Sequence, residues 1–329
     1  MKTFCVSLLL VLLSVSLSFS RESQSEFPAL KGPYLGQPPP GPVSEVFAGG
    51  ILNELSMIHG RITFSPDGGE VYWSCNAAPV QSRWYMSQDT NGVWSRPQAS
   101  FLSVGDSENA LSFSPDGKRM YYHSRRPDEG RGGSNDQDIW YRERTEEGWG
   151  DPVNLGAPVN NVDLDDWAPT VAGDGTMYFC RVASRRHHGS DDREGQAAGA
   201  NDIYFSRLIE GEYTEPVRLG PEVNSESHDI EPAVSPDNTY IVFISNRPGG
   251  YSAMMNLYVS FRVEAGDWTE AQCLSDKFEV DNIWFPSLTS DGKYLCFCGG
   301  FPTSGGYTNS DYYWVDTKAI EGLRPKSPE

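Results

Sequence analysis

Acidic residues gather just ahead of five similar strand segments, together with two tryptophans and two histidines. The side chains of this predicted axial ring are His59, Glu108, Asp165, Asp166, Trp167, His228, Asp229, Glu231, Asp281 and Trp284. Several carboxylate oxygens can bind a hard cation such as Ca²⁺. Two carboxyl groups at a suitable separation can hydrolyse a glycosidic bond. Carboxylates beside aromatic rings can bind a sugar or a cationic peptide.

The same groups also have a purely structural use. Carboxylates at strand ends accept hydrogen bonds from neighbouring segments, and acidic loop residues are common on any acidic protein. The sequence has no G-x-S-x-G elbow, no H-E-x-x-H pair and no phosphate-binding loop, so it lacks the usual signatures of serine hydrolases, zinc proteases and P-loop enzymes. The residues alone leave ligand binding, hydrolysis and structural support open.

A short repeated unit positions these side chains. Each copy has an apolar stretch, a tight turn that contains Asp, and an aromatic-rich strand; the turn aspartates are Asp67, Asp116, Asp174, Asp237 and Asp291. The clearest turns read Ser-Pro-Asp-Gly, in which Pro fixes φ and Gly supplies a left-handed residue. Two strands therefore meet at each turn as a hairpin.

The second strand of each hairpin is expected at 70–74, 119–124, 176–181, 240–245 and 294–299. A third and a fourth strand follow each hairpin. The third strands are expected at 83–87, 138–143, 202–207, 256–261 and 311–316. A fourth strand begins at an aromatic residue followed three positions later by Pro, as in Trp149 and Pro152. This pattern predicts an all-β propeller of four-stranded antiparallel blades. Five blades are counted, and a sixth would have to come from residues 27–60.

The last unit lacks its own fourth strand, because little chain follows its third strand. Residues 41–47 have the composition of that missing strand. We expect this N-terminal strand to complete the final blade, which closes the ring and hides its edges. In a propeller the first strand of each blade lines the central channel, so the predicted axial ring should surround one mouth of that channel.

The turn residues resemble the PD40 family, the WD40-like repeats related to the propeller of the periplasmic protein TolB. The resemblance covers about residues 42–316 and implies a propeller. It says little about activity, because the shared residues form turns and pack the blades. TolB-type propellers have six blades, so the five units here weaken any transfer of TolB's partner, the peptidoglycan-associated lipoprotein.

The first twenty residues indicate export. Residues 1–20 combine an early Lys2, a short apolar run and small residues, which is typical of a cleavable signal peptide. We expect a flexible segment at 21–40, the propeller at 41–317, a tail at 318–329 and a periplasmic or secreted protein without a membrane span.

The net charge of −19 argues against a nucleic-acid partner. The five cysteines after residue 20 cannot all pair, and four lie in apolar strands, where a free thiol packs as a small hydrophobe.

A long charged loop at 182–201 is a second candidate site. It contains His187 and His188 near Asp191 and Asp192, which could ligate a metal, but adjacent histidines in a polar loop usually stay solvated. Arg125 or Arg126, and Arg247, lie in loops that share Ser-x-Arg-Pro and could brace the blades instead.

The leading hypothesis is an exported, non-catalytic propeller that binds a protein, peptide or glycan through its axial face. We expect a monomer and no cofactor, with Ca²⁺ as the metal that the carboxylates would suit. The alternative is a glycan- or lactone-directed hydrolase that uses the acidic ring.

Overall fold

The computed structural model describes residues 27–52, 57–77, 80–102, 108–127, 136–182, 201–252, 254–263, 266–278, 280, 282–299, 302–303, 306–307 and 311–325. The predicted signal peptide and the histidines of the 182–201 loop lie outside these ranges. In the part described, no helix is long and apolar enough to cross a membrane.

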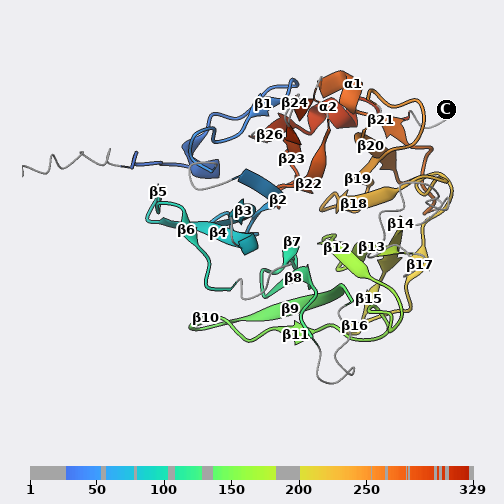
Figure 1. Cartoon of the computed structure of the whole chain (residues 1–329), viewed down its shortest axis with the longest axis horizontal. Helices are drawn as coiled ribbons and strands as arrows, with labels where there is room; N and C mark the ends of the chain where they lie inside the picture. The colour runs from blue at the N-terminus through green and yellow to red at the C-terminus, as the bar shows by residue number, and fades with distance from the viewer. Residues whose placement is uncertain are drawn as a thin grey trace, which may run out of the picture.

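Five antiparallel sheets stand around a central axis as the blades of a propeller (Figure 1). Blade 1 contains β2 (Met57–Phe64), β3 (Glu70–Ala77), β4 (Val80–Thr90) and β6 (Gln98–Ala99), with β5 (Val93–Trp94) paired antiparallel to the end of β4. Blade 2 contains β7 (Asn109–Phe113), β8 (Arg119–Ser124), β9 (Asp138–Thr145) and β11 (Val153–Asn154), with β10 (Gly148–Trp149) paired to β9. Blade 3 contains β12 (Asp166–Val171), β13 (Met177–Val182), β14 (Asn201–Ser206) and β17 (Val217–Arg218), with a small outer hairpin of β15 (Leu208–Ile209) and β16 (Glu212–Tyr213).

Blades 4 and 5 complete the ring. Blade 4 contains β18 (Asp229–Val234), β19 (Tyr240–Ser245), β20 (Asn256–Phe261) and β21 (Gln272–Cys273). Blade 5 contains β22 (Trp284–Leu288), β23 (Tyr294–Gly299), β26 (Asp311–Asp316) and β1 (Glu45–Val46). The remaining elements are η1 (Tyr34–Gly36), α1 (Ser275–Phe278), α2 (Lys318–Glu321) and the pair β24 (Pro302–Thr303) and β25 (Gly306–Tyr307). The all-β propeller with five blades is thus confirmed.

The N-terminal strand closes the ring as expected. Glu45 and Val46 pair antiparallel with Trp314 and Tyr313 of β26. The Phe47 amide donates to the Tyr312 carbonyl oxygen at 2.7 Å. Because β1 takes the fourth position of blade 5, the described residues between 27 and 60 supply one strand to the last blade and begin the first, and they form no sixth blade.

Two described segments outside the blades, 30–35 and 318–321, pack against the ring. Within the segment expected to be flexible, Leu35 is buried, and the Tyr34 hydroxyl donates to Asp291 Oδ2 at 2.9 Å. The Trp94 amide donates to the Leu30 carbonyl oxygen at 3.0 Å, so this segment joins blades 1 and 5. In the expected tail, Ile320 of α2 is fully buried. Apolar side chains in these short segments account for the packing, since their burial is favourable.

The blades pack face to face, so their second strands are buried on both sides. Burial therefore runs continuously along β8, β13, β19 and β23 rather than alternating. The cysteines described here, Cys75, Cys180, Cys273, Cys296 and Cys298, are free thiols, and four of them are buried.

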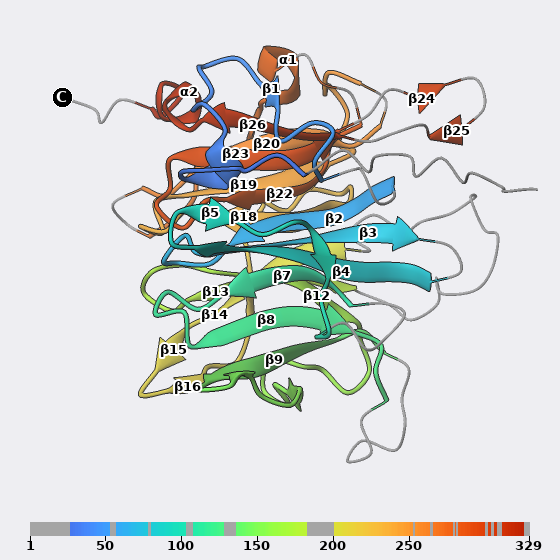
Figure 2. The same cartoon turned by 90° about the vertical axis from the view of Figure 1, so that its left-hand side faces the viewer.

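Figure 2 shows the blades from the side, so that the two ends of the ring can be told apart. The loop face carries the loops that enter each first strand and those that join second to third strands. The turn face carries the Asp-containing hairpin turns between first and second strands. The first strands β2, β7, β12, β18 and β22 lie next to one another around the axis.

Candidate functional site

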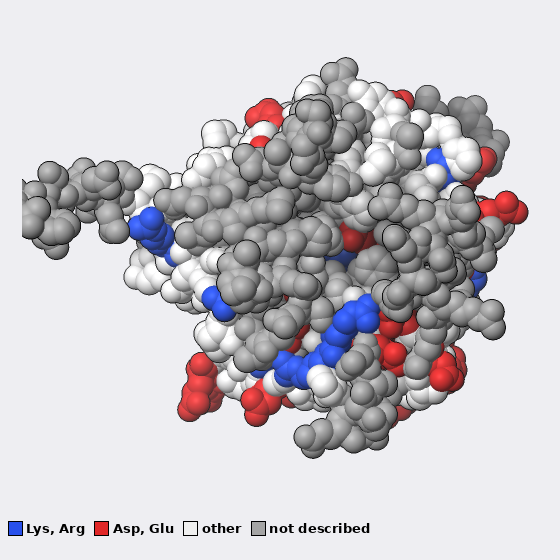
Figure 3. All heavy atoms as spheres, in the orientation of Figure 1, with Lys and Arg blue, Asp and Glu red and all other residues white. Residues whose placement is uncertain are grey.

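Most of the predicted axial ring lies where the chain enters the first strands, on the loop face. Figure 3 shows this face, where cationic side chains form a strip near the middle with acidic side chains beside it. The His59 side chain and Asp281 lie outside the described residues. A role in ligand binding for the ring stays a prediction; its geometry follows.

Asp166 and Asp229 occupy the same place in blades 3 and 4, and both are fully buried. Each begins its first strand and forms an ion pair with an arginine at the end of the second strand, as Arg181 is, or just after it, as Arg247 is. Asp166 Oδ1 accepts from Arg181 Nε at 2.7 Å, and its Oδ2 accepts from the Asn161 amide at 2.7 Å. Asp229 Oδ1 pairs with Arg247, and its Oδ2 accepts from the Ser225 amide at 2.5 Å. These carboxylates hold each first strand to its neighbours.

Glu108 and Asp165 pair with the consecutive arginines of the blade 2 loop. Arg126 Nη2 donates to Glu108 Oε1 at 2.6 Å, and Arg125 Nη2 donates to Asp165 Oδ2 at 3.3 Å. Both acids are buried, whereas the two arginine side chains keep 22% and 32% of their surface exposed. The acids therefore face inward, and the arginines present part of their charge to solvent.

Glu231 differs from the other described acids of the ring, because no described arginine lies within ion-pair distance of it. Its Oε2 accepts from the Phe285 amide at 2.5 Å, and its own amide donates to Cys180 Sγ at 3.1 Å. Burial raises the pKa of Glu231 to about 7, and the nearby Arg61 offsets part of this rise. Burial likewise raises the pKa of Asp166 to about 7 despite its bonds to Arg181.

The other members of the ring also have structural contacts. His228 approaches Asn201 Nδ2 with its Nδ1 at 2.6 Å. Trp284 Nε1 donates to Asn282 Oδ1 at 2.8 Å. Trp167 is half-buried and meets the His123 ring edge-on at 6.1 Å. Both tryptophans are partly buried and pack against the hydrophobic core.

The described carboxylates of the ring are thus engaged by cations, backbone amides or hydroxyl groups. Within the described ranges, no three His, Cys, Asp or Glu side chains are grouped so that they could hold a metal ion. Carboxylates held in this way serve poorly as an exposed acid and base pair, which a glycosidase needs on both sides of the bond it cleaves. The arrangement is suited to fixing the strands from which the loops project.

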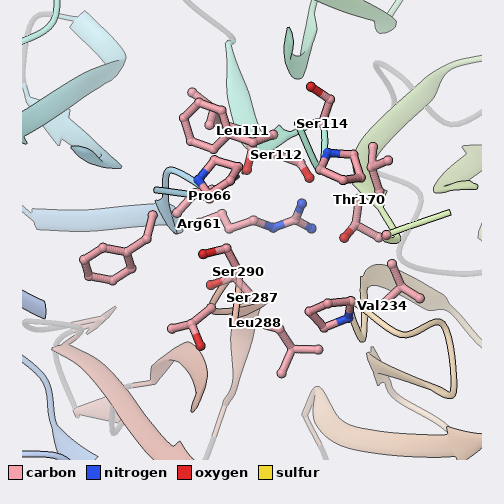
Figure 4. A pocket seen from close by; sticks show the side chains of 18 residues that line it. Arg61, Pro66, Leu111, Ser112, Ser114, Thr170, Val234, Ser287, Leu288 and Ser290 are labelled. Atoms are coloured by element: carbon pink, nitrogen blue, oxygen red, sulfur yellow. Dashed lines mark hydrogen bonds between the residues drawn. The ribbon is translucent and has the colours of Figure 1, made fainter. Parts of the chain in front are cut away.

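A cavity of about 280 Å³ lies at the other end of the channel (Figure 4). It extends from Arg61 to the turn residues Pro66, Pro115 and Pro236. This cavity was not predicted from the sequence, because only charged residues in loops were considered as candidate sites. Two positions in the repeat could have revealed it. One holds Arg61, four residues before the turn. The other, two residues before the turn, holds Thr63, Ser112, Thr170 and Ser287 in four of the five blades.

No protein-family model matches the chain, and no curated protein matches it. Solved structures with a similar fold include a TolB-type protein from Agrobacterium tumefaciens, at 18% identity and a TM-score of 0.43, over 66% of this chain and 65% of the other. TolB from Acinetobacter baumannii is 16% identical with a TM-score of 0.43, over 82% of this chain and 53% of that one. The tricorn protease is 17% identical with a TM-score of 0.49, over 85% of this chain and 24% of its own length.

The chain therefore spans less than two thirds of the length of these proteins. Their similarity to it concerns the fold alone. TolB-type propellers are among them, as the turn residues led us to expect, whereas membership of the PD40 family stays a prediction.

Replacing Glu231 with Gln is expected to change how stability depends on pH. The folded carboxyl has a pKa of about 7 against an ordinary value of 4.5, so the folded state holds this proton more tightly. The resulting stabilisation is complete below pH 4.5 and is lost as the pH rises through 7. Glu231→Gln has no proton to lose, so its free energy of unfolding should rise relative to the unchanged protein by about 3 kcal/mol between pH 4.5 and 8. Urea unfolding at several pH values measures this difference.

The comparison isolates Glu231 because other titrating groups are present in both proteins. His123, whose pKa burial and Arg61 lower to about 3, cancels in the difference. A difference between the two proteins that does not vary with pH would contradict the burial argument.

Proposed function

We propose that the protein is an exported, non-catalytic β-propeller that binds a protein, peptide or glycan through its loop face. One observation carries this proposal: the described carboxylates of the axial ring are buried and already bonded within the protein. Asp166 and Asp229 accept from arginines and backbone amides, which leaves them little capacity to act on a substrate. The ring then serves as a rigid base for the loops above it.

The loop face also exposes large apolar side chains. Phe101, in the loop that follows the fourth strand of blade 1, is 73% exposed, and Tyr251 and Met254, between β19 and β20, are 48% and 44% exposed. Aromatic side chains on a rigid base are common anchors in interfaces, because they bury large areas with few rotatable bonds. The arginines that pair with Glu108 and Asp165 add partly exposed charge to the same face.

Hydrolysis is the second candidate, and the raised pKa values of Asp166 and Glu231 favour it. A carboxyl group that stays protonated near pH 7 can act as a general acid. Both groups are nevertheless at most 3% exposed, so a substrate could reach them only after the loop face rearranged. This burial makes binding the better-supported function.

The proposal is tested by thermal unfolding of the purified protein with chito-oligosaccharides, hexalysine and hexaglutamate. A probe that binds the folded state raises the melting temperature. The variants Phe101→Ser and Tyr251→Ser should reduce that rise. Ile209→Ser is a matched control, because Ile209 is 54% exposed in the β15–β16 hairpin on the turn face.

The same sample should release no products from a panel of polysaccharides. Turnover that Asp229→Asn abolishes would contradict the proposal. If the loop-face variants keep the rise in melting temperature and Ile209→Ser loses it, the binding surface lies on the turn face instead.

A further inference from the structure

The cavity on the turn face has a buried cation at its inner end. Arg61 is 3% exposed and extends from β2 into the middle of the ring of first strands (Figure 4). Its Nη1 donates to the Pro169 carbonyl oxygen at 2.6 Å, and its Nη2 donates to the Pro232 carbonyl oxygen at 3.1 Å. The side chain thus crosses the channel from blade 1 to blades 3 and 4.

These two bonds leave the guanidinium incompletely satisfied. It has five N–H donors, and its Nε is buried without a hydrogen-bond partner among the described residues. The described residues also provide no carboxylate within ion-pair distance of Arg61; Glu231 acts on it only from farther away. A buried cation without a close counter-charge is unfavourable unless further acceptors reach it.

Hydroxyl groups form the next layer of the channel towards the turn face. They belong to Thr63, Ser112, Thr170 and Ser287, which share one position in the repeat and line the cavity. Thr63 and Ser287 donate to the carbonyl oxygens of Leu111 and Ile62, at 2.7 and 2.6 Å. The hydroxyls of Ser112 and Thr170 bond to no described residue, so their protons are available to a ligand.

We propose that this axial pocket binds a small oxyanion group, a carboxylate or a phosphate, that enters from the turn face. Arg61 supplies the positive charge, and the hydroxyls of Ser112 and Thr170 donate hydrogen bonds to the anion. A guanidinium and neutral hydroxyl donors are the groups with which proteins usually bind both anions. A cavity of about 280 Å³ accommodates a small solute.

The charge of the whole protein opposes anion binding, so the local groups of this pocket decide it. A net charge of −19 repels anions from the surface in general, so any affinity for them must come from local groups. The titratable groups that act on Arg61 or that Arg61 acts on are Glu231, Cys180 and His123. Cys180 and His123 are neutral at pH 6 to 8, because burial raises the thiol pKa well above its usual value and holds the histidine pKa near 3. Glu231 gains negative charge across that range, so acetate, whose own charge is constant there, should bind several-fold more weakly at pH 8 than at pH 6.

Calorimetric titration of the full protein with sodium phosphate and with sodium acetate, at constant ionic strength, tests the site. Sodium chloride is the reference salt. We expect saturable binding of at least one of the two anions, and the stronger of the two indicates whether the natural ligand carries phosphate or carboxylate. The double variant Ser112→Ala/Thr170→Val should weaken this binding about tenfold or more, because it removes two donors from the anion. It should fold normally, since neither hydroxyl bonds to a described residue.

Arg61→Gln should abolish binding, and Arg119→Gln is its control. Arg119, at the start of the second strand of blade 2, pairs with Glu143 of the third strand, and both side chains are partly exposed. This variant therefore changes the net charge equally and should bind as the unchanged protein does. Phosphate and acetate heats no larger than those of chloride would overturn the proposal. So would binding that the double variant leaves unchanged, even if Arg61→Gln fails to fold.

Discussion

Replacing Trp314 with Ala is expected to lower the free energy of unfolding by about 3 to 5 kcal/mol, as large-to-small changes of a buried tryptophan do. Trp314 lies in β26, is 2% exposed, and its indole centroid is 4.8 Å from the ring of Phe47 and 5.0 Å from that of Tyr294. It therefore fills the junction where the two ends of the chain complete blade 5. Chemical denaturation with urea measures the loss.

Trp149→Ala is the matched control, because Trp149 is half-buried on the outer hairpin of blade 2. It should lose less than half as much stability. Combining Trp314→Ala with Phe47→Ala tests closure itself. Residues in contact couple by about 0.5 kcal/mol or more in such a double-mutant cycle. Strictly additive losses would mean that the N-terminal strand does not pack on β26.

Arg247→Met is expected to have an effect of similar size, about 3 to 5 kcal/mol, because it leaves a buried carboxylate without its cation. Asp229 is fully buried, and the Arg247 side chain is 14% exposed. Arg247 also donates to the Val223 carbonyl oxygen at 2.5 Å and lies over the Tyr258 ring at 4.8 Å. Met preserves some of the packing, so most of the loss should come from the unpaired charge. Urea unfolding at pH 7 measures this loss.

The control for this prediction is Arg119→Met. Arg119 and Glu143 form an ion pair whose side chains are 36% and 57% exposed. Water and salt screen such a pair, so its loss should change stability by less than about 1 kcal/mol. Equal losses in the two variants would show that burial does not distinguish the pairs.

The turn residues and aromatic strands were sufficient to predict the propeller. The reason is local: a Ser-Pro-Asp-Gly turn between two apolar strands has few alternatives, so each copy specifies its own hairpin. The absence of a fourth strand after β26 was sufficient to predict closure by residues near Val46. The packing of Leu35 and Ile320 was not predicted, because it depends on contacts with distant blades rather than on local pattern.

The candidate site was predicted in part. Counting from the turns correctly located Asp166, Asp229 and their equivalents at the starts of the first strands. Their arginine partners follow later in the sequence, too far along the chain for the ion pairs to be predicted from spacing. Arg181, for example, is fifteen residues from Asp166. Arg61 was overlooked because a single basic residue in a strand has no characteristic spacing. Its importance follows only from its place on the axis.

Asp229→Asn gives the most direct test of the claim that the axial carboxylates support the fold and carry out no catalysis. Unfolding and the release of products from polysaccharides should be measured on the same preparations of variant and unchanged protein. We expect the variant to lose about 2 to 3 kcal/mol of stability, because Arg247 loses its buried partner, and neither protein to turn over a substrate. Turnover by the unchanged protein that disappears in a fully stable Asp229→Asn variant would contradict the claim.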